Sequence, residues 1–89
     1  MSDGRTVTLR YFAWVREKVG RGEETVGLPS SVTTVADLMA WLKGRGPEYA
    51  AAFERHAVIR TAIDQRHVKP DAPLANAREI AFFPPVTGG

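Results

Sequence analysis

Apolar and polar residues alternate along residues 6–12 (TVTLRYF), the pattern of a strand with one buried face. The inward positions are Val7, Leu9 and Tyr11. Phe12 falls on the opposite, outward face. Residues 13–19 then space two valines one helical turn apart before Gly20, which predicts a short helix. A second strand at 24–28 completes a predicted hairpin whose connection contains that helix.

The longest helical pattern begins at Thr34, whose side chain can cap the backbone while Asp37, three residues later, reaches back. One apolar stripe follows at helical spacing: Val35, Leu38, Met39 and Leu42. We expect this segment to be the main helix, with Trp41 covering an edge of the core. Glycines after residue 43 end it, and Pro47 can open a short helix over 47–53.

Three further strands are predicted in the last third of the chain, at 58–64, 66–69 and 79–83. A turn at 76–78 precedes the last one, because asparagine tolerates left-handed backbone geometry. In this last strand two residues face the core and two face outward, respectively Ile80 with Phe82 and Ala81 with Phe83. Strands on both sides of one principal helix predict an α+β domain in which a mixed sheet wraps that helix.

Composition and charge exclude several classes of protein but do not identify one function. The 89 residues suit one domain, and the 44% hydrophobic and 25% charged fractions are those of ordinary globular proteins. The net charge of +2 is scattered rather than clustered, so we expect no nucleic-acid partner. No apolar run is long enough to span a membrane, and the polar start MSDGR does not resemble a signal peptide, so we expect a cytoplasmic protein.

The chain offers little conventional catalytic chemistry. It has no cysteine, so any sulfur chemistry needs a sulfur atom from another molecule. His56 and His67 lack the companions and spacing of a metal site, and we expect none. Glu23 and Glu24 point to opposite faces of a strand and cannot act together as a general acid and base.

The C-terminal sequence FFPPVTGG is the most informative stretch. Pro84 and Pro85 lack N–H groups, so they end the sheet and predict a domain over 1–83 followed by an extended tail over 84–89. Two terminal glycines give that tail a small cross-section and an unshielded carboxylate, which suits a narrow active site in a partner. A disordered tail is the usual interpretation of a terminal Gly-Gly, but the aromatic and proline pairs before it favour a function.

Phe12 and Phe83 are predicted on the outer faces of the first and last strands. If these strands are neighbours, the two rings form an apolar patch beside the base of the tail, suited to docking a partner. Local cover by a helix or loop is the alternative, weighed equally for Phe12 and less favoured for Phe83.

The sequence resembles the MoaD-type family, the small sulfur-carrier subunits of molybdopterin synthase, which have a ubiquitin-like β-grasp fold. YFAWVREKVG, residues 11–20, is similar to the family's aromatic-Ala-x-Val-Arg-Glu-x-x-Gly segment, and EIAFFPPVTGG, residues 79–89, is similar to its C-terminus. The resemblance covers nearly the whole chain.

This resemblance implies roles for individual residues. Gly89 would be adenylated by an E1-like activating enzyme that uses ATP, then converted to a thiocarboxylate by a sulfur donor. The large synthase subunit would receive the tail and bind the pterin substrate, cyclic pyranopterin monophosphate, with Gly88, Thr87 and Val86 lining its channel. Phe12 and Phe83 would form the docking face, Arg16 would be a polar contact there, and His67 would occupy a position where an apolar residue is expected. The chain itself would bind no cofactor and would not be catalytic alone.

Two alternatives remain open at this point. Sulfur carriers for thiamine synthesis or tRNA thiolation, and ubiquitin-like modifiers, share the fold and the Gly-Gly end. A β-grasp binding module with an inert tail would use only the aromatic patch.

Overall fold

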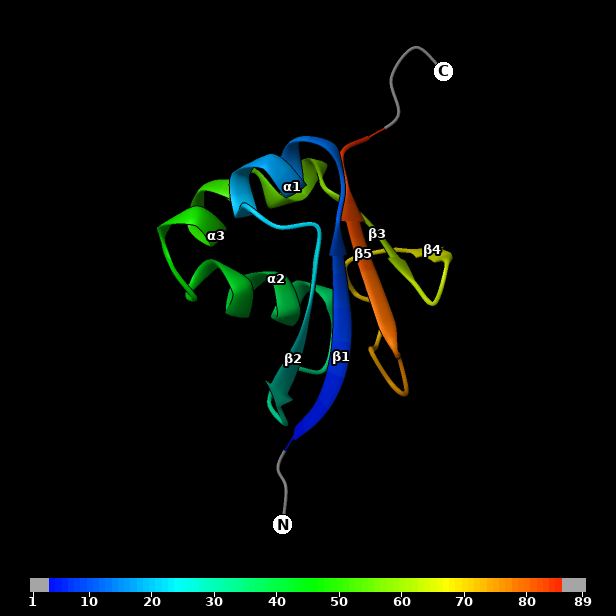
Figure 1. Ribbon diagram of the computed structural model, residues 1–89. Helices are drawn as coiled ribbons and strands as arrows, with labels where there is room; N and C mark the ends of the chain where they lie inside the picture. Colours follow the sequence, from blue (N-terminus) through cyan, green and yellow to red (C-terminus); the bar gives the residue numbers. More distant parts are fainter. Residues whose placement is uncertain (1–3, 86–89) are drawn as a thin grey trace.

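The computed structural model describes residues 4–85 and shows a five-stranded sheet with its helices on one face (Figure 1). The elements in chain order are β1 (Gly4–Tyr11), α1 (Ala13–Val19), β2 (Glu23–Pro29), α2 (Val35–Lys43), α3 (Pro47–Ala52), the 3-10 helix η1 (His56–Val58), β3 (Arg60–Ile63), β4 (Arg66–Val68) and β5 (Glu79–Phe83). The α+β prediction, with one main helix on a mixed sheet, is confirmed.

The strand order is β2-β1-β5-β3-β4. β1 pairs antiparallel with β2 and parallel with β5, with Leu9 opposite Ile80 and Tyr11 opposite Phe82. The first and last strands are therefore neighbours at the centre of the sheet, as expected, and both run toward the same end of the molecule (Figure 1).

The inward faces of β1 and β5 and the stripe of α2 form the core. Its fully buried members include the predicted residues Val7, Leu9, Tyr11, Val35, Leu38, Met39, Leu42, Ile80 and Phe82. Trp41 is partly buried against this cluster, as predicted for an edge position. At the start of α2 the Thr34 hydroxyl accepts a hydrogen bond from the Asp37 N–H at 3.1 Å, and the Asp37 carboxylate accepts one from the Thr34 N–H at 3.2 Å, which confirms the capping box. Hydrogen bonds from the Thr33 N–H and hydroxyl, and from Thr34, lower the pKa of Asp37.

Two predictions about the last third of the chain were wrong in detail. Val58 does not begin a strand: it ends η1, and β3 starts only at Arg60. The turn before β5 places Ala75, not Asn76, in the left-handed region, with a φ of 47°. Sequence propensity favours asparagine there, but the turn is set by the hydrogen bond from the Ala77 N–H to the Leu74 carbonyl (2.8 Å), which buries both residues.

Ala75 gives a test of backbone strain. A left-handed conformation costs an L-residue roughly 1–2 kcal/mol and glycine almost nothing, while glycine makes the unfolded chain more flexible. Ala75→Gly should therefore raise the free energy of unfolding by up to about 1 kcal/mol. The matched control, Ala40→Gly on the exposed side of α2, should lower it by about 0.5–1 kcal/mol. Urea unfolding followed by circular dichroism measures both, and equal losses would contradict the strained turn.

Candidate functional site

The site predicted from the sequence lies where β1 and β5 end side by side. The Phe12 N–H donates to the Phe82 carbonyl at 3.1 Å, so the backbone of the two strands stays joined up to this point. The chain then turns sharply: Ala13 has a φ of 54°, and the Phe12 carbonyl accepts from the Val15 N–H at 3.1 Å to start α1. This turn leaves the Phe12 side chain 41% exposed, the exposed large apolar residue of the described chain.

Phe83 is half-buried on the outer face of the sheet, where its aromatic neighbour is His67. Its ring meets the His67 ring edge to face, with the two centroids 5.3 Å apart. Strand β3 lies between β5 and β4, and its residue opposite His67 is the small Ala62. The two rings can therefore meet across β3. His67 thus extends the aromatic surface toward β4.

The outer surface is less purely apolar than expected. The Arg10 guanidinium lies 5.5 Å from the centre of the Phe12 ring, a cation–π contact, and also 3.7 Å from carboxylate oxygens of Glu23 and Glu79. Within residues 4–85 no ring-to-ring contact joins Phe12 to Phe83. The predicted patch is therefore a pair of aromatic positions flanked by Arg10 on one side and His67 on the other.

Arg16 lies one helical turn after Phe12, and its N–H donates to the Phe12 carbonyl at 3.4 Å. Its side chain packs over Gly22, where an added Cβ would come within 3.3 Å of the Arg16 Nε atom. The side chain thus lies at the α1–β2 connection, next to the end of β1, where the Gly22 carbonyl accepts from the Tyr11 N–H at 2.8 Å. Phe83 and His67 therefore form a contact pair on β5 and β4, while Phe12 and Arg16 lie together at the end of β1 and the start of α1. That a partner contacts these four residues stays a prediction.

The tail predictions fall mostly outside the structure. β5 ends at Phe83, immediately before Pro84, as the missing N–H groups of the two prolines require. Pro84 and Pro85 are half-buried. Val86, Thr87, Gly88 and Gly89 lie outside the described residues, so the division into a domain over 1–83 and a tail over 84–89 stays a prediction.

An inner aromatic cluster supports the end of β5. Phe82 stacks on Tyr11 with centroids 6.2 Å apart and meets Phe53 edge to face at 5.1 Å. All three rings are fully buried. Because Phe82 and Phe83 are successive strand residues, this cluster fixes the backbone from which the outer ring and the prolines project.

Glu24 holds this cluster by an arrangement that the sequence reasoning missed. Its Oε2 atom accepts hydrogen bonds from the Tyr11 hydroxyl (2.8 Å), the Tyr49 hydroxyl (2.6 Å) and the Arg45 guanidinium (3.0 Å), and Arg21 reaches Oε1 at 3.3 Å. The Glu24 side chain is only 7% exposed. Alternation along β2 could have shown it, because Glu24 shares the inward face with Val26 and Leu28.

The electrostatics of this network follow from its geometry. Burial alone would raise the pKa of Glu24, but the hydrogen bonds from Tyr49, Tyr11 and Arg45 outweigh burial and lower it. Burial and then the hydrogen bond to Glu24 raise the pKa of Tyr11, and the same two causes raise the pKa of Tyr49. The network therefore holds one carboxylate charged and two phenols neutral at physiological pH.

Nothing in the described part of the chain suggests a resident metal or a membrane segment. Within residues 4–85 no group of three His, Cys, Asp or Glu side chains gathers as ligands would. Among the helices of that range, none has the length and apolar character that a membrane crossing needs.

Comparison with known proteins now decides the family. A model described as the ThiS family matches residues 9–89, which is most of the chain. The chain belongs to the ThiS family. It is 36% identical over 83 residues to the molybdopterin synthase sulfur carrier subunit of Escherichia coli, covering 93% of this chain and 99% of that one. A Mycosarcoma maydis protein of the same name is 31% identical, with both chains fully covered.

Solved structures agree on the fold of this ThiS-family chain. A Pyrococcus furiosus protein named molybdopterin converting factor, subunit 1, superposes with a TM-score of 0.70 at 27% identity, covering 92% of this chain and 99% of that one. Small archaeal modifier protein 1 of Haloferax volcanii gives 0.71 at 23% identity, covering 93% and 100% respectively, which supports the fold alone. The expected ubiquitin-like β-grasp architecture is confirmed.

The Glu24 network predicts a pH-dependent stability. Glu24→Gln should lower the free energy of unfolding at pH 7 by about 1–3 kcal/mol, the range for hydrogen bonds to a charged group. The folded pKa of Glu24 is lowered, so its contribution is complete above the unfolded pKa of about 4.3 and is lost as pH falls through the folded value. Urea unfolding should therefore show the difference from wild type shrinking below about pH 4.

Glu23→Gln is the matched control. Glu23 is exposed and lies 3.7 Å from Arg10, so its loss should change stability by no more than about 1 kcal/mol. A Glu24→Gln effect as small as that of Glu23→Gln would show that the network does not stabilise the fold.

Proposed function

We propose that this chain is the sulfur-carrier subunit of a molybdopterin synthase in the cytoplasm, and that its chemistry takes place at the Gly89 carboxylate. One observation carries the proposal: β5, fixed by the buried Phe82, ends at Phe83 and is followed at once by Pro84-Pro85 and the sequence Val-Thr-Gly-Gly. The names of the relatives support the same role, because proteins similar over their whole length are called molybdopterin synthase sulfur carrier subunits.

The proposed chemistry needs activation, because a carboxylate is a poor electrophile. In an activating partner of the E1 type, a Gly89 oxygen attacks the α-phosphate of ATP, pyrophosphate leaves, and an acyl-adenylate forms. A sulfur donor of the hydrosulfide class then attacks the acyl carbon and AMP leaves, which yields a C-terminal thiocarboxylate. This chain contributes no catalytic group to these steps: it presents the terminus.

The large subunit is the proposed site of sulfur transfer. The tail enters its cleft, and the thiocarboxylate sulfur attacks a side-chain carbon of the bound pterin precursor, cyclic pyranopterin monophosphate. The carbon–oxygen bond at that carbon breaks and the oxygen leaves, so the pterin is joined to Gly89 through sulfur. Water then hydrolyses the acyl–sulfur bond, which leaves the sulfur on the pterin and restores the Gly89 carboxylate. Repeating the cycle supplies the second sulfur of a dithiolene. A narrow cleft explains why the last two residues are glycines, which have no side chains.

A second candidate function keeps the carrier and changes the acceptor. The matching family description is the ThiS family, and carriers for thiamine synthesis or tRNA thiolation would use the same terminus. The acceptor of the sulfur distinguishes these carriers from one another. A binding module with an inert tail is distinguished from all of them because its C-terminal carboxylate is never converted to a thiocarboxylate.

The terminus itself can be tested by mass. After incubation with the activating enzyme, ATP and a sulfur donor, intact-mass analysis should show the increase expected for replacing one oxygen by sulfur, located in the C-terminal peptide. Deletion of Gly89 should abolish this increase without changing the melting temperature, because a terminal glycine has no side chain to pack into a core. An unmodified terminus in the presence of all three components would contradict every carrier function.

The outer aromatic face predicts a separation of binding from folding. Phe83→Ala should weaken binding to the large subunit by about tenfold or more, because partly exposed aromatic rings commonly anchor interfaces, and should change stability by no more than about 1 kcal/mol. Phe82→Ala, one residue earlier but fully buried, should instead destabilise the fold by about 3–5 kcal/mol. Calorimetric titration and urea unfolding measure the two effects. If Phe83→Ala costs mainly stability, the ring belongs to the core.

A further inference from the structure

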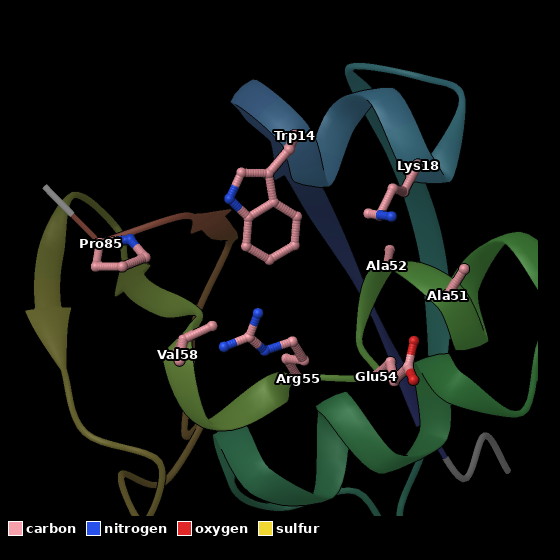
Figure 2. Close-up of a pocket in the computed structure, with 8 residues that line it drawn as sticks. All are labelled: Trp14, Lys18, Ala51, Ala52, Glu54, Arg55, Val58 and Pro85. Atoms are coloured by element: carbon pink, nitrogen blue, oxygen red, sulfur yellow. The ribbon is translucent and has the colours of Figure 1, made fainter. Parts of the chain in front are cut away.

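A groove of about 420 Å³ lies on the helical side of the molecule, next to the point where the chain leaves β5 (Figure 2). Trp14 and Lys18 of α1 line one wall, and Glu54, Arg55 and Val58 line the other. The small alanines of α3 leave the space between them open. Pro85 closes one end, so the groove and the tail share a residue.

The side chains in this groove are unusual for a surface depression. Figure 2 shows the indole of Trp14 and the guanidinium of Arg55 both projecting into the cavity, with the Lys18 ammonium entering from α1. Lys18 and Arg55 are exposed, and neither forms an ion pair with any residue in the range 4–85. Among the described residues that line the groove, only Glu54 carries a carboxylate, so this lining combines an aromatic wall with an excess of positive charge.

The length of the tail determines what must lie over this groove. Four residues follow Pro85, and a fully extended chain spans at most about 3.6 Å per residue, or roughly 14 Å in all. A partner that holds Gly89 at its reactive centre must therefore bring the mouth of its cleft close to Pro85. The protein surface around that mouth then lies against the residues around Pro85, including this groove.

We propose that the groove is a second docking site for the large subunit of molybdopterin synthase, separate from the outer aromatic face. It takes a segment at the mouth of the cleft that carries an apolar side chain beside a carboxylate. The apolar side chain packs on Trp14 and Val58, and the carboxylate pairs with Arg55 and Lys18. This inference rests on the proposed function, because it requires the tail to enter that subunit.

Charge reversal is the first test. Lys18→Glu combined with Arg55→Glu should weaken binding of the purified large subunit by about tenfold or more, with a smaller dependence on salt than wild type. The matched control is Arg5→Glu combined with Lys69→Glu, which makes the same change in net charge at exposed positions outside the groove and should alter binding by no more than about twofold. Glu54→Gln should tighten binding, because it removes a carboxylate that repels the incoming one.

A second measurement leaves the groove unchanged. In a Trp41→Phe chain labelled with fluorotryptophan, Trp14 gives the only fluorine NMR signal. Its resonance should shift when unlabelled large subunit is added, because the ring passes from partial exposure to an enclosed contact. Circular dichroism of each variant confirms that binding losses do not come from unfolding.

The outcomes separate the two proposals. If wild type does not bind the large subunit, the proposed function fails and this inference fails with it. If wild type binds but the Trp14 resonance does not move and the reversed variant binds as tightly as its control, the groove is not a docking site. A Trp14 shift on adding the activating enzyme or excess unlabelled chain, with none for the large subunit, overturns the occupant proposed here.

Discussion

The parallel pairing of β1 with β5 inside the sheet determines where the other functional features of the molecule lie. It places Tyr11 opposite Phe82, so the two strands finish at the same end of the molecule. Because the strands are parallel, the start of α1 and the point where the chain leaves β5 also lie at that end (Figure 1). Phe12, Phe83, the groove beside Pro85 and the exit of the chain are neighbours for this single reason.

Glu24 reinforces this pairing from the inside. It joins Tyr11 of β1 to Tyr49 of α3 through one carboxylate oxygen, and Tyr11 in turn stacks on Phe82. A buried carboxylate without partners would be costly, but this one receives three hydrogen bonds at Oε2 and a fourth at Oε1. Buried packing therefore holds the end of β5 as far as Phe82, immediately before the outer ring of Phe83 and the two prolines.

The sequence predicted most of the fold because its patterns were local. Alternation around Leu9, the stripe containing Leu38 and the Thr34–Asp37 box each depend on neighbouring residues, and each was confirmed. The sequence predicted Asn76 as the left-handed residue of the last turn, but that residue is Ala75, because tertiary packing overrode local preference there. Features that depend on distant parts of the chain were not predicted. The four hydrogen-bond partners of Glu24 come from separate elements and connections. The groove beside Trp14 forms only where α1, α3 and Pro85 come together. The packing of the Arg16 side chain over Gly22 was not predicted either, because it depends on the path of the α1–β2 connection.

The fate of the sulfur distinguishes a molybdopterin synthase carrier from every alternative. The chain would be charged with isotopically labelled sulfur and mixed with the large subunit and cyclic pyranopterin monophosphate, with a thiazole precursor offered in a parallel reaction. We expect the label to leave the Gly89 thiocarboxylate and to appear in the pterin as a dithiolene, while the terminus returns to a carboxylate. Label that stays on the chain, or that enters only the thiazole precursor, would contradict it.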